Sequence, residues 1–70
     1  MAHTKVDYKK EVLNVYPNAT YMYFEQSSIR HKIRDYTISG VGENIGQSII
    51  NEYFAWANAY LTLLSQGKIN

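Results

Sequence analysis

Three cations that alternate with other residues form the most suggestive polar pattern in the chain. Arg30, Lys32 and Arg34 are spaced two apart, and on a β-strand such residues project to the same side over about 13 Å. Tyr21 and Tyr23 belong to a neighbouring predicted strand and would flank them. A cationic and aromatic sheet face suits single-stranded nucleic acid, through phosphate contacts and base stacking, and equally suits an acidic protein surface. A solvated strand face without a ligand is the third interpretation.

Side chains that could perform catalysis do not form a recognisable arrangement. Ser27, Ser28 and His31 are close in sequence, with Glu25 and Asp35 nearby, but they lack the pattern of a nucleophile elbow. A 70-residue chain also offers little concavity from which water could be excluded. We therefore predict that the protein is not an enzyme, and that His31 is a partly buried histidine bonded to a neighbour.

Ligands for metals and cofactors are few. The chain has no cysteine, and its two histidines, His3 and His31, are too few for a structural zinc site. Gly40, Gly42 and Gly46 precede a predicted helix, but their spacing is not that of a dinucleotide-binding loop and no P-loop lysine follows. We expect a hinge there, with an anion or nucleotide site as the minor alternative, and no cofactor.

Length and composition limit the chain to one small domain, residues 1–70. Hydrophobic residues make up 46% and charged residues 19%, which is typical of a globular protein. The net charge of +1 is neither that of an acidic DNA mimic nor that of a general nucleic-acid binder. Because a core of this size supplies only a few kcal/mol of stability, self-association is expected, and we predict a homodimer.

The sequence also carries expectations about location. The first residues contain no apolar stretch typical of a signal peptide, and polar residues interrupt the most apolar segment, Ile45 to Leu64. We expect no membrane span and a cytoplasmic location, which would be the host cytoplasm for a phage-encoded protein.

Apolar spacing predicts a helix at the start of the chain and two strands after it. A helix over residues 5–15 is expected, opened by Thr4 and Asp7 as a capping-box variant and ended by Pro17. A strand over 20–26 should point Met22 and Phe24 inward.

A second strand should start at residue 29. In it Ile29, His31 and Ile33 share one face. The apolar set then moves to Tyr36 and Ile38, which predicts a bulge or bend near residue 35 and leaves room for a third strand.

The rest of the chain reads as one long helix, from Glu43 or Asn44 to Ser65 or Gln66, with Gly67 as its left-handed stop. The expected fold is α+β, in the order α-β-β-(β)-α, with an antiparallel sheet packed against this helix. Trp56, Tyr60 and Leu63 lie toward a flank of this helix, where they either complete the core or form an exposed surface for docking or dimerisation.

The glycine-containing segment at the start of this last helix and the alanines of the helix resemble the end of a double-stranded-RNA-binding domain. That resemblance implies the order helix, three strands, helix. It also implies lysines that grip phosphates at the start of the second helix, and this chain instead has Glu43, Asn44, Gln47 and Ser48 there.

Two further segments resemble small accessory proteins of bacteriophages: Val12 to Ala19, which includes Tyr-Pro-Asn-Ala, and Trp-Ala-Asn-Ala-Tyr at 56–60. The resemblance implies a viral, non-enzymatic protein that binds and inhibits or redirects a bacterial host component, such as a defence complex targeted by an anti-CRISPR-type inhibitor. The alternative is a small nucleic-acid-binding module that uses the basic and aromatic sheet face.

Overall fold

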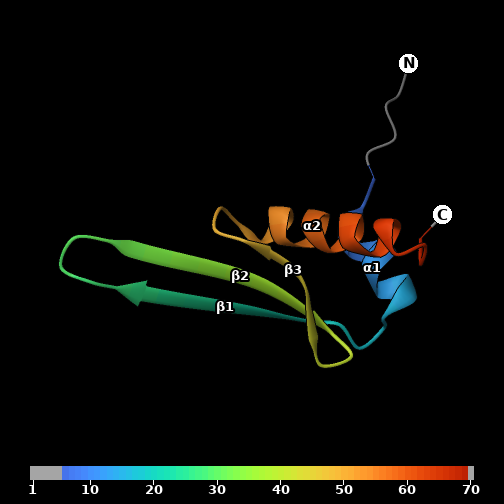
Figure 1. Cartoon of the computed structure of the whole chain (residues 1–70), viewed down its shortest axis with the longest axis horizontal. Coiled ribbons are helices and arrows are strands. Elements are labelled where there is room, and N and C mark those ends of the chain that lie inside the picture. The colour runs from blue at the N-terminus through green and yellow to red at the C-terminus, as the bar shows by residue number, and fades with distance from the viewer. Residues whose placement is uncertain (1–5, 70) are drawn as a thin grey trace, which may run out of the picture.

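Two helices and a three-stranded antiparallel sheet make up the chain, in a computed structural model that describes residues 6–69 (Figure 1). The elements, in chain order, are α1 (Tyr8–Val15), β1 (Thr20–Ser27), β2 (Lys32–Gly40), β3 (Glu43–Ser48) and α2 (Glu52–Ser65). The sheet has the order β1-β2-β3, α2 packs over β3 and β2, and α1 packs against α2. The predicted α+β class is confirmed, and a third strand is present, but at residues 43–48; Tyr36 and Ile38, where a third strand was left open, continue β2.

Helix α1 begins three residues later than predicted. Asp7 caps it, because its side chain accepts a hydrogen bond from the amide of Lys10 at 3.1 Å. The helix ends before Tyr16 and Pro17, as the proline requires. Thr4, the other half of the predicted capping box, lies outside the described residues.

Strands β1 and β2 form a long hairpin that extends beyond the rest of the domain (Figure 1). Their pairing is continuous from Thr20 opposite Ser39 to Ser27 opposite Lys32. Strand β3 pairs with β2 only over residues 36–40. Residues 24–35 therefore form a two-stranded projection, the hairpin arm, and the Cα radius of gyration is 13.5 Å, against about 11 Å for a compact domain of this length.

The prediction that Met22 and Phe24 point inward is wrong. Residues directly opposite in an antiparallel pair share a face, and Tyr21 lies opposite Ile38, which is fully buried under the helices. The tyrosine set therefore faces the helices, while Met22 and Phe24 lie on the open face and are 59% and 61% exposed. Both alternating sets of this strand are apolar, so the pattern alone did not identify the buried one.

The outer part of the second strand also differs from prediction. Residues 29 and 30 lie in the hairpin turn, so β2 starts at Lys32. His31 is exposed rather than partly buried, and Ile33 is exposed on the open face. No bulge occurs near Asp35, since no core packs against the arm and the exposed side chains need not keep one apolar face.

The long C-terminal helix was predicted to start too early. Residues 43–48 form β3, joined to β2 by Val41 and Gly42, whose φ angles of 53° and 79° are those of a two-residue type I′ turn. Helix α2 starts at Glu52, after Asn51 caps it by accepting a hydrogen bond from the amide of Phe54 at 2.9 Å. The expected hinge at residues 40–46 is therefore a hairpin turn followed by a strand.

The register shift in the sheet lies in β3. Ile38 pairs with Gly46 and Ser39 with Asn44, so Ile45 is the extra residue of the bulge. Ile45 is buried in the core.

The end of α2 agrees with the prediction. Gly67 has a φ of 73°, and the amides of Gly67 and Lys68 donate to the carbonyls of Leu64 and Leu63. These two bonds form a Schellman motif, which satisfies the last carbonyls of the helix.

The core lies between α2, the inner halves of β2 and β3, and α1. Its buried apolar residues are Val12, Ile38, Ile45, Ala55, Trp56, Ala59 and Leu63. Of the two interpretations of Trp56 and Leu63, completion of the core is confirmed and an exposed docking flank is wrong, since they are 4% and 0% exposed. Tyr60 is half-buried, with its ring 5.1 Å from that of Tyr8. Among residues 6–69, no helix has both the length and the apolar character needed to cross a membrane.

Candidate protein-binding surface

Two of the three predicted cations lie on β2, on the face that the helices partly cover. Lys32 lies opposite Ser27, and Arg34 lies opposite Glu25. Tyr21 and Tyr23 project to the same face farther along β1, as predicted for flanking aromatic residues. Arg30 lies in the hairpin turn, so the three cations do not form one row along a strand.

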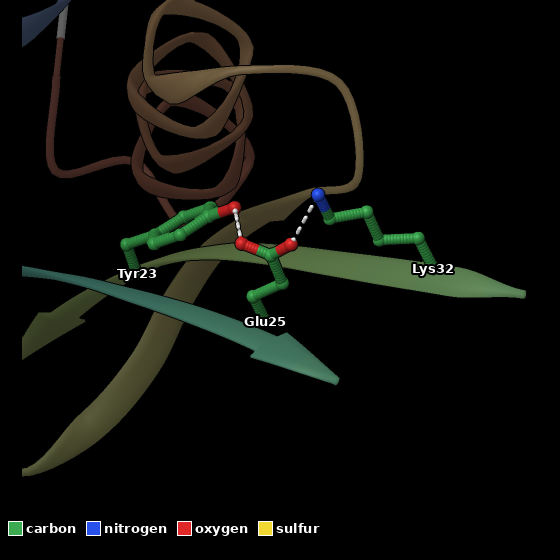
Figure 2. Close-up of polar contacts among 3 residues, drawn as sticks. All are labelled: Tyr23, Glu25 and Lys32. Carbon is green, nitrogen blue, oxygen red and sulfur yellow. Dashed lines mark hydrogen bonds and ion pairs between the residues drawn. The ribbon is translucent and has the colours of Figure 1, made fainter. Parts of the chain in front are cut away.

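A carboxylate neutralises part of this positive face. Glu25 Oε1 forms an ion pair with Lys32 Nζ at 2.8 Å, and Glu25 Oε2 accepts a hydrogen bond from the Tyr23 hydroxyl at 2.9 Å (Figure 2). The ion pair joins the two strands and the hydrogen bond joins two positions of β1, and both contacts lie on the face that the helices partly cover. Within the described residues, Arg30 and Arg34 have no carboxylate within ion-pair distance. The face is therefore less positive than its sequence suggests.

Tyr21 lies at the base of the arm, where the helices begin to cover the sheet. Partial burial raises the pKa of its hydroxyl above the ordinary value of 10.0, and the nearby carboxylate of Glu52 and the hydroxyl of Tyr36 raise it further. Tyr21 is thus held neutral and contributes to the boundary of the core rather than to a charged site.

A cluster of exposed apolar residues lies directly before α2 and on its first turn. The sequence did not predict this cluster. Ile49 and Ile50 are 73% and 61% exposed, and Tyr53 and Phe54 on the first turn of the helix are also exposed. The Ser48 hydroxyl accepts a hydrogen bond from the amide of Ile50 at 3.0 Å, which holds this connection in place. The predicted long helix from Glu43 or Asn44 would contain both isoleucines. The signal that could have found them is Asn51, a good N-cap residue directly after two isoleucines.

The apolar cluster adjoins the cations of the arm. Ile49 lines a hollow of about 410 Å³ together with Lys32, Ile33 and Arg34. Segments distant in sequence thus meet at one surface, which we call the composite surface. It consists of Lys32, Ile33, Arg34 and Ile49, which line the hollow, together with the exposed apolar residues that follow Ile49 in sequence, Ile50, Tyr53 and Phe54.

A second hollow continues from the helical end of this surface. It has a volume of about 600 Å³ and is lined by Tyr53, Trp56, Tyr8 and Lys9, among others. The indole of Trp56 is fixed, because its Nε1 donates to Glu52 Oε2 at 2.9 Å. An apolar side chain of a partner could enter between the aromatic rings of this groove, which is how contact residues in interfaces are buried.

Within residues 6–69, the side chains considered for catalysis form no hydrogen bonds with one another. The hydroxyl of Ser28 contacts the backbone of His31, with the His31 amide 3.1 Å and its carbonyl oxygen 3.3 Å away. Asp35 accepts hydrogen bonds from Thr37 and Gln47. These contacts stabilise the hairpin turn and the sheet. Within residues 6–69, no three His, Cys, Asp or Glu side chains are grouped to hold a metal ion.

The glycine-containing segment does not form an anion site at a helix N-terminus. Gly40 and Gly42 lie at the β2–β3 turn, and Gly46 lies under α2, against Ala55 and Ala59. The start of α2 also lacks the lysines that the resemblance to a double-stranded-RNA-binding domain implies, because Ile49, Ile50, Asn51 and Glu52 stand there. The helix itself contains no lysine or arginine.

Comparisons of the chain with models of protein families, with curated proteins and with solved structures found no match.

Proposed function

We propose that the chain is a small non-enzymatic binding protein that contacts another protein through the composite surface. The observation that carries this proposal is that Ile49, the first residue of the exposed apolar cluster, lines one hollow with the cations Lys32 and Arg34. Protein interfaces combine an apolar and aromatic centre with a polar rim. Tyr and Arg are among the residues that contribute most to binding.

The chemistry of this surface favours an acidic protein over nucleic acid. Two isoleucines and a phenylalanine gain free energy when another apolar surface covers them, whereas phosphates would leave them in water. Lys32 is already paired with Glu25, and this ion pair lowers the attraction of the composite surface for a polyanion. Arg34 remains to pair with a carboxylate at the rim, where it would set orientation more than affinity.

The proposed partner is a component of a bacterial host, such as a defence complex, which the chain would inhibit or redirect as an anti-CRISPR-type protein does. Support for this class of partner comes from the two segments that resemble phage accessory proteins. Both segments are structural in this fold: Tyr16 and Pro17 end α1, and Trp56 and Ala59 pack in the core. The resemblance therefore supports a class of protein, and the composite surface supports the mode of binding.

The test is affinity capture from bacterial lysate with matched variants. Wild-type protein should retain a discrete protein after nuclease treatment. The double substitution Ile49→Asp and Ile50→Asp should abolish capture, whereas charge reversal at Arg30, Lys32 and Arg34 should weaken it. Val41→Asp is the control, because Val41 is equally exposed but lies at the opposite end of β2. Equal capture by the Ile49 and Ile50 variant would rule out the proposed surface.

Single-stranded nucleic acid is the second candidate, because Arg30 and Arg34 form no ion pair within residues 6–69 and the aromatic ring of Tyr23 lies on the same hairpin. The affinity of the protein for nucleic acid should fall steeply as the salt concentration rises, since phosphate binding releases counterions. Nuclease should then remove all bound material, and the Ile49 and Ile50 substitutions should have little effect. These outcomes separate the two candidates in the same experiment.

A further inference from the structure

The outer edge of β1 is a long, regular strand edge that no described strand covers. β1 has eight residues, and within residues 6–69 it pairs only with β2. Its sequence, TYMYFEQS, contains one charge and no proline, and its pairing with β2 contains no bulge. Proteins usually protect such edges with lysine, proline or a bulge, because the free amides and carbonyls can pair with another chain.

The opposite edge of the sheet is protected. β3 has six residues, its ladder is interrupted by the bulge at Ile45, and α2 packs over it. The two edges therefore differ, and β1 is the one suited to pairing with another strand.

The arm also lacks the support that a stable hairpin needs. Among the residues that the structure describes, only β1 and β2 form the arm beyond Tyr36, and Phe24 and Ile33 are exposed on its open face. An isolated two-stranded hairpin is marginally stable in water, and a third strand or a covering layer normally stabilises it. Pairing along β1 would supply the missing strands.

We propose that β1 pairs antiparallel with β1 of a second copy of this chain, about a two-fold axis at Tyr23. In such a pair the residues opposite each other share a face, so their two numbers must add to an even sum. A centre at Tyr23 or at Phe24 gives the longest ladders, of about seven residue pairs. The centre at Tyr23 places each Met22 opposite Phe24 of the other copy, whereas the centre at Phe24 places Met22 opposite the polar Gln26.

Charge excludes a third register. A centre at Glu25 would place the two Glu25 carboxylates opposite each other, and like charges directly opposite destabilise a strand pair. The centre at Tyr23 places Glu25 opposite Tyr21 of the second copy instead. This contact brings no like charges together on either face of the ladder.

The resulting dimer would have a six-stranded sheet with all four helices on one side. Seven residue pairs form about six to eight backbone hydrogen bonds, close to the roughly ten of a typical interface. The composite surface lies along β2 and the start of α2, on the other side of the hairpin, so each dimer would present it twice. The inference does not depend on the proposed function.

The first test compares two lysine substitutions on the open face of the arm. Phe24 and Ile33 are similarly exposed, at 61% and 53%, but only Phe24 lies on the edge strand. Light scattering should give wild type and Ile33→Lys twice the chain mass of 8.1 kDa, and Phe24→Lys the mass of one chain with an unchanged circular dichroism spectrum. Wild type that stays at 8.1 kDa across a wide range of concentrations would overturn the inference.

The second test uses the absence of cysteine from the chain. Opposite residues in an antiparallel pair have Cα atoms about 4.5 to 5.5 Å apart, which is within reach of a disulfide. Tyr23→Cys should therefore form a disulfide dimer rapidly under mild oxidation. Ile33→Cys is the control, because the two copies of residue 33 would be three strand spacings apart across the sheet, about 14 Å, and also offset along the strands. Equal rates of dimer formation for the two variants would also overturn the inference.

Discussion

Gly46 on β3 lies so close to Ala59 on α2 that a β-carbon added at Gly46 would lie 2.5 Å from the amide nitrogen of Ala59. The same carbon would lie 2.5 Å from the carbonyl oxygen of Ala55. Both are backbone atoms of the helix, which no side-chain rotation can move. The absence of a side chain at Gly46 therefore sets how closely α2 packs on the sheet.

Gly46→Ala should consequently destabilise the domain strongly. Overpacking of this kind typically costs about 1 to 3 kcal/mol or more, and a core of this size has only a few kcal/mol of stability. Urea denaturation followed by circular dichroism measures the change. Glu43→Ala, an exposed position on the same strand, should change the free energy of unfolding by less than about 0.5 kcal/mol. Equal stability of the two variants would show that α2 does not rest on Gly46.

Two adjacent leucines of α2 provide a direct test of which face of the helix is buried. Leu63 is fully buried and Leu64 is exposed. Leu63→Ala should lower the free energy of unfolding by about 2 to 5 kcal/mol, through lost burial and the cavity left behind. Leu64→Ala should cost less than about 1 kcal/mol. A larger loss at Leu64 in thermal or urea denaturation would mean that Leu64 is covered, for example by another molecule.

The fold class was predictable because the strongest local signals are unambiguous. Pro17 ends a helix and Gly67 stops one, whatever the rest of the chain does. The region of residues 43–50 was not predictable from periodicity. Ile45 and Ile49 are spaced as on a helix, and the turn at Val41 and Gly42 lacks the Asn-Gly or Asp-Gly sequence that usually identifies a two-residue hairpin.

The candidate site was predictable only in part, because its two halves come from different segments. The alternation of Lys32 and Arg34 on a strand can be read from the sequence, and so can their proximity to Tyr23. The exposed position of Ile49 and Ile50 depends on where α2 begins, and their contact with the arm depends on the register of three strands. Glu25 also changes the charge of the face, and its partner Lys32 is seven residues away.

The turn between β2 and β3 contains a residue in an unfavourable backbone conformation. Val41 has a φ of 53° and its side chain is exposed. A β-branched residue rarely adopts this conformation, and asparagine adopts it more readily. Val41→Asn creates the favoured Asn-Gly pair with Gly42. It should stabilise the domain by about 1 kcal/mol, which corresponds to a rise of about 4 to 8 °C in Tm for a domain of this size. An unchanged or lower Tm would contradict the strain assigned to this turn.

Tyr21 should make the domain sensitive to alkaline pH. Its pKa in the folded protein is raised above 10.0, first by burial and then by Glu52 and Tyr36. The neutral hydroxyl is thus favoured by folding, so its contribution to stability is fully present below pH 10.0 and is lost as the pH rises through the folded pKa. Tyr21→Phe cannot ionise, so its urea midpoint should fall less steeply above pH 10.0 than that of wild type. Near neutral pH the difference in urea midpoint between the two proteins should not change with pH, because the Tyr21 hydroxyl is uncharged in the folded and in the unfolded chain. That constant difference measures packing alone, so any further change above it measures ionisation. Parallel curves above pH 10.0 would show that Tyr21 titrates alike in the folded and unfolded chains, and would place its ring away from the core boundary.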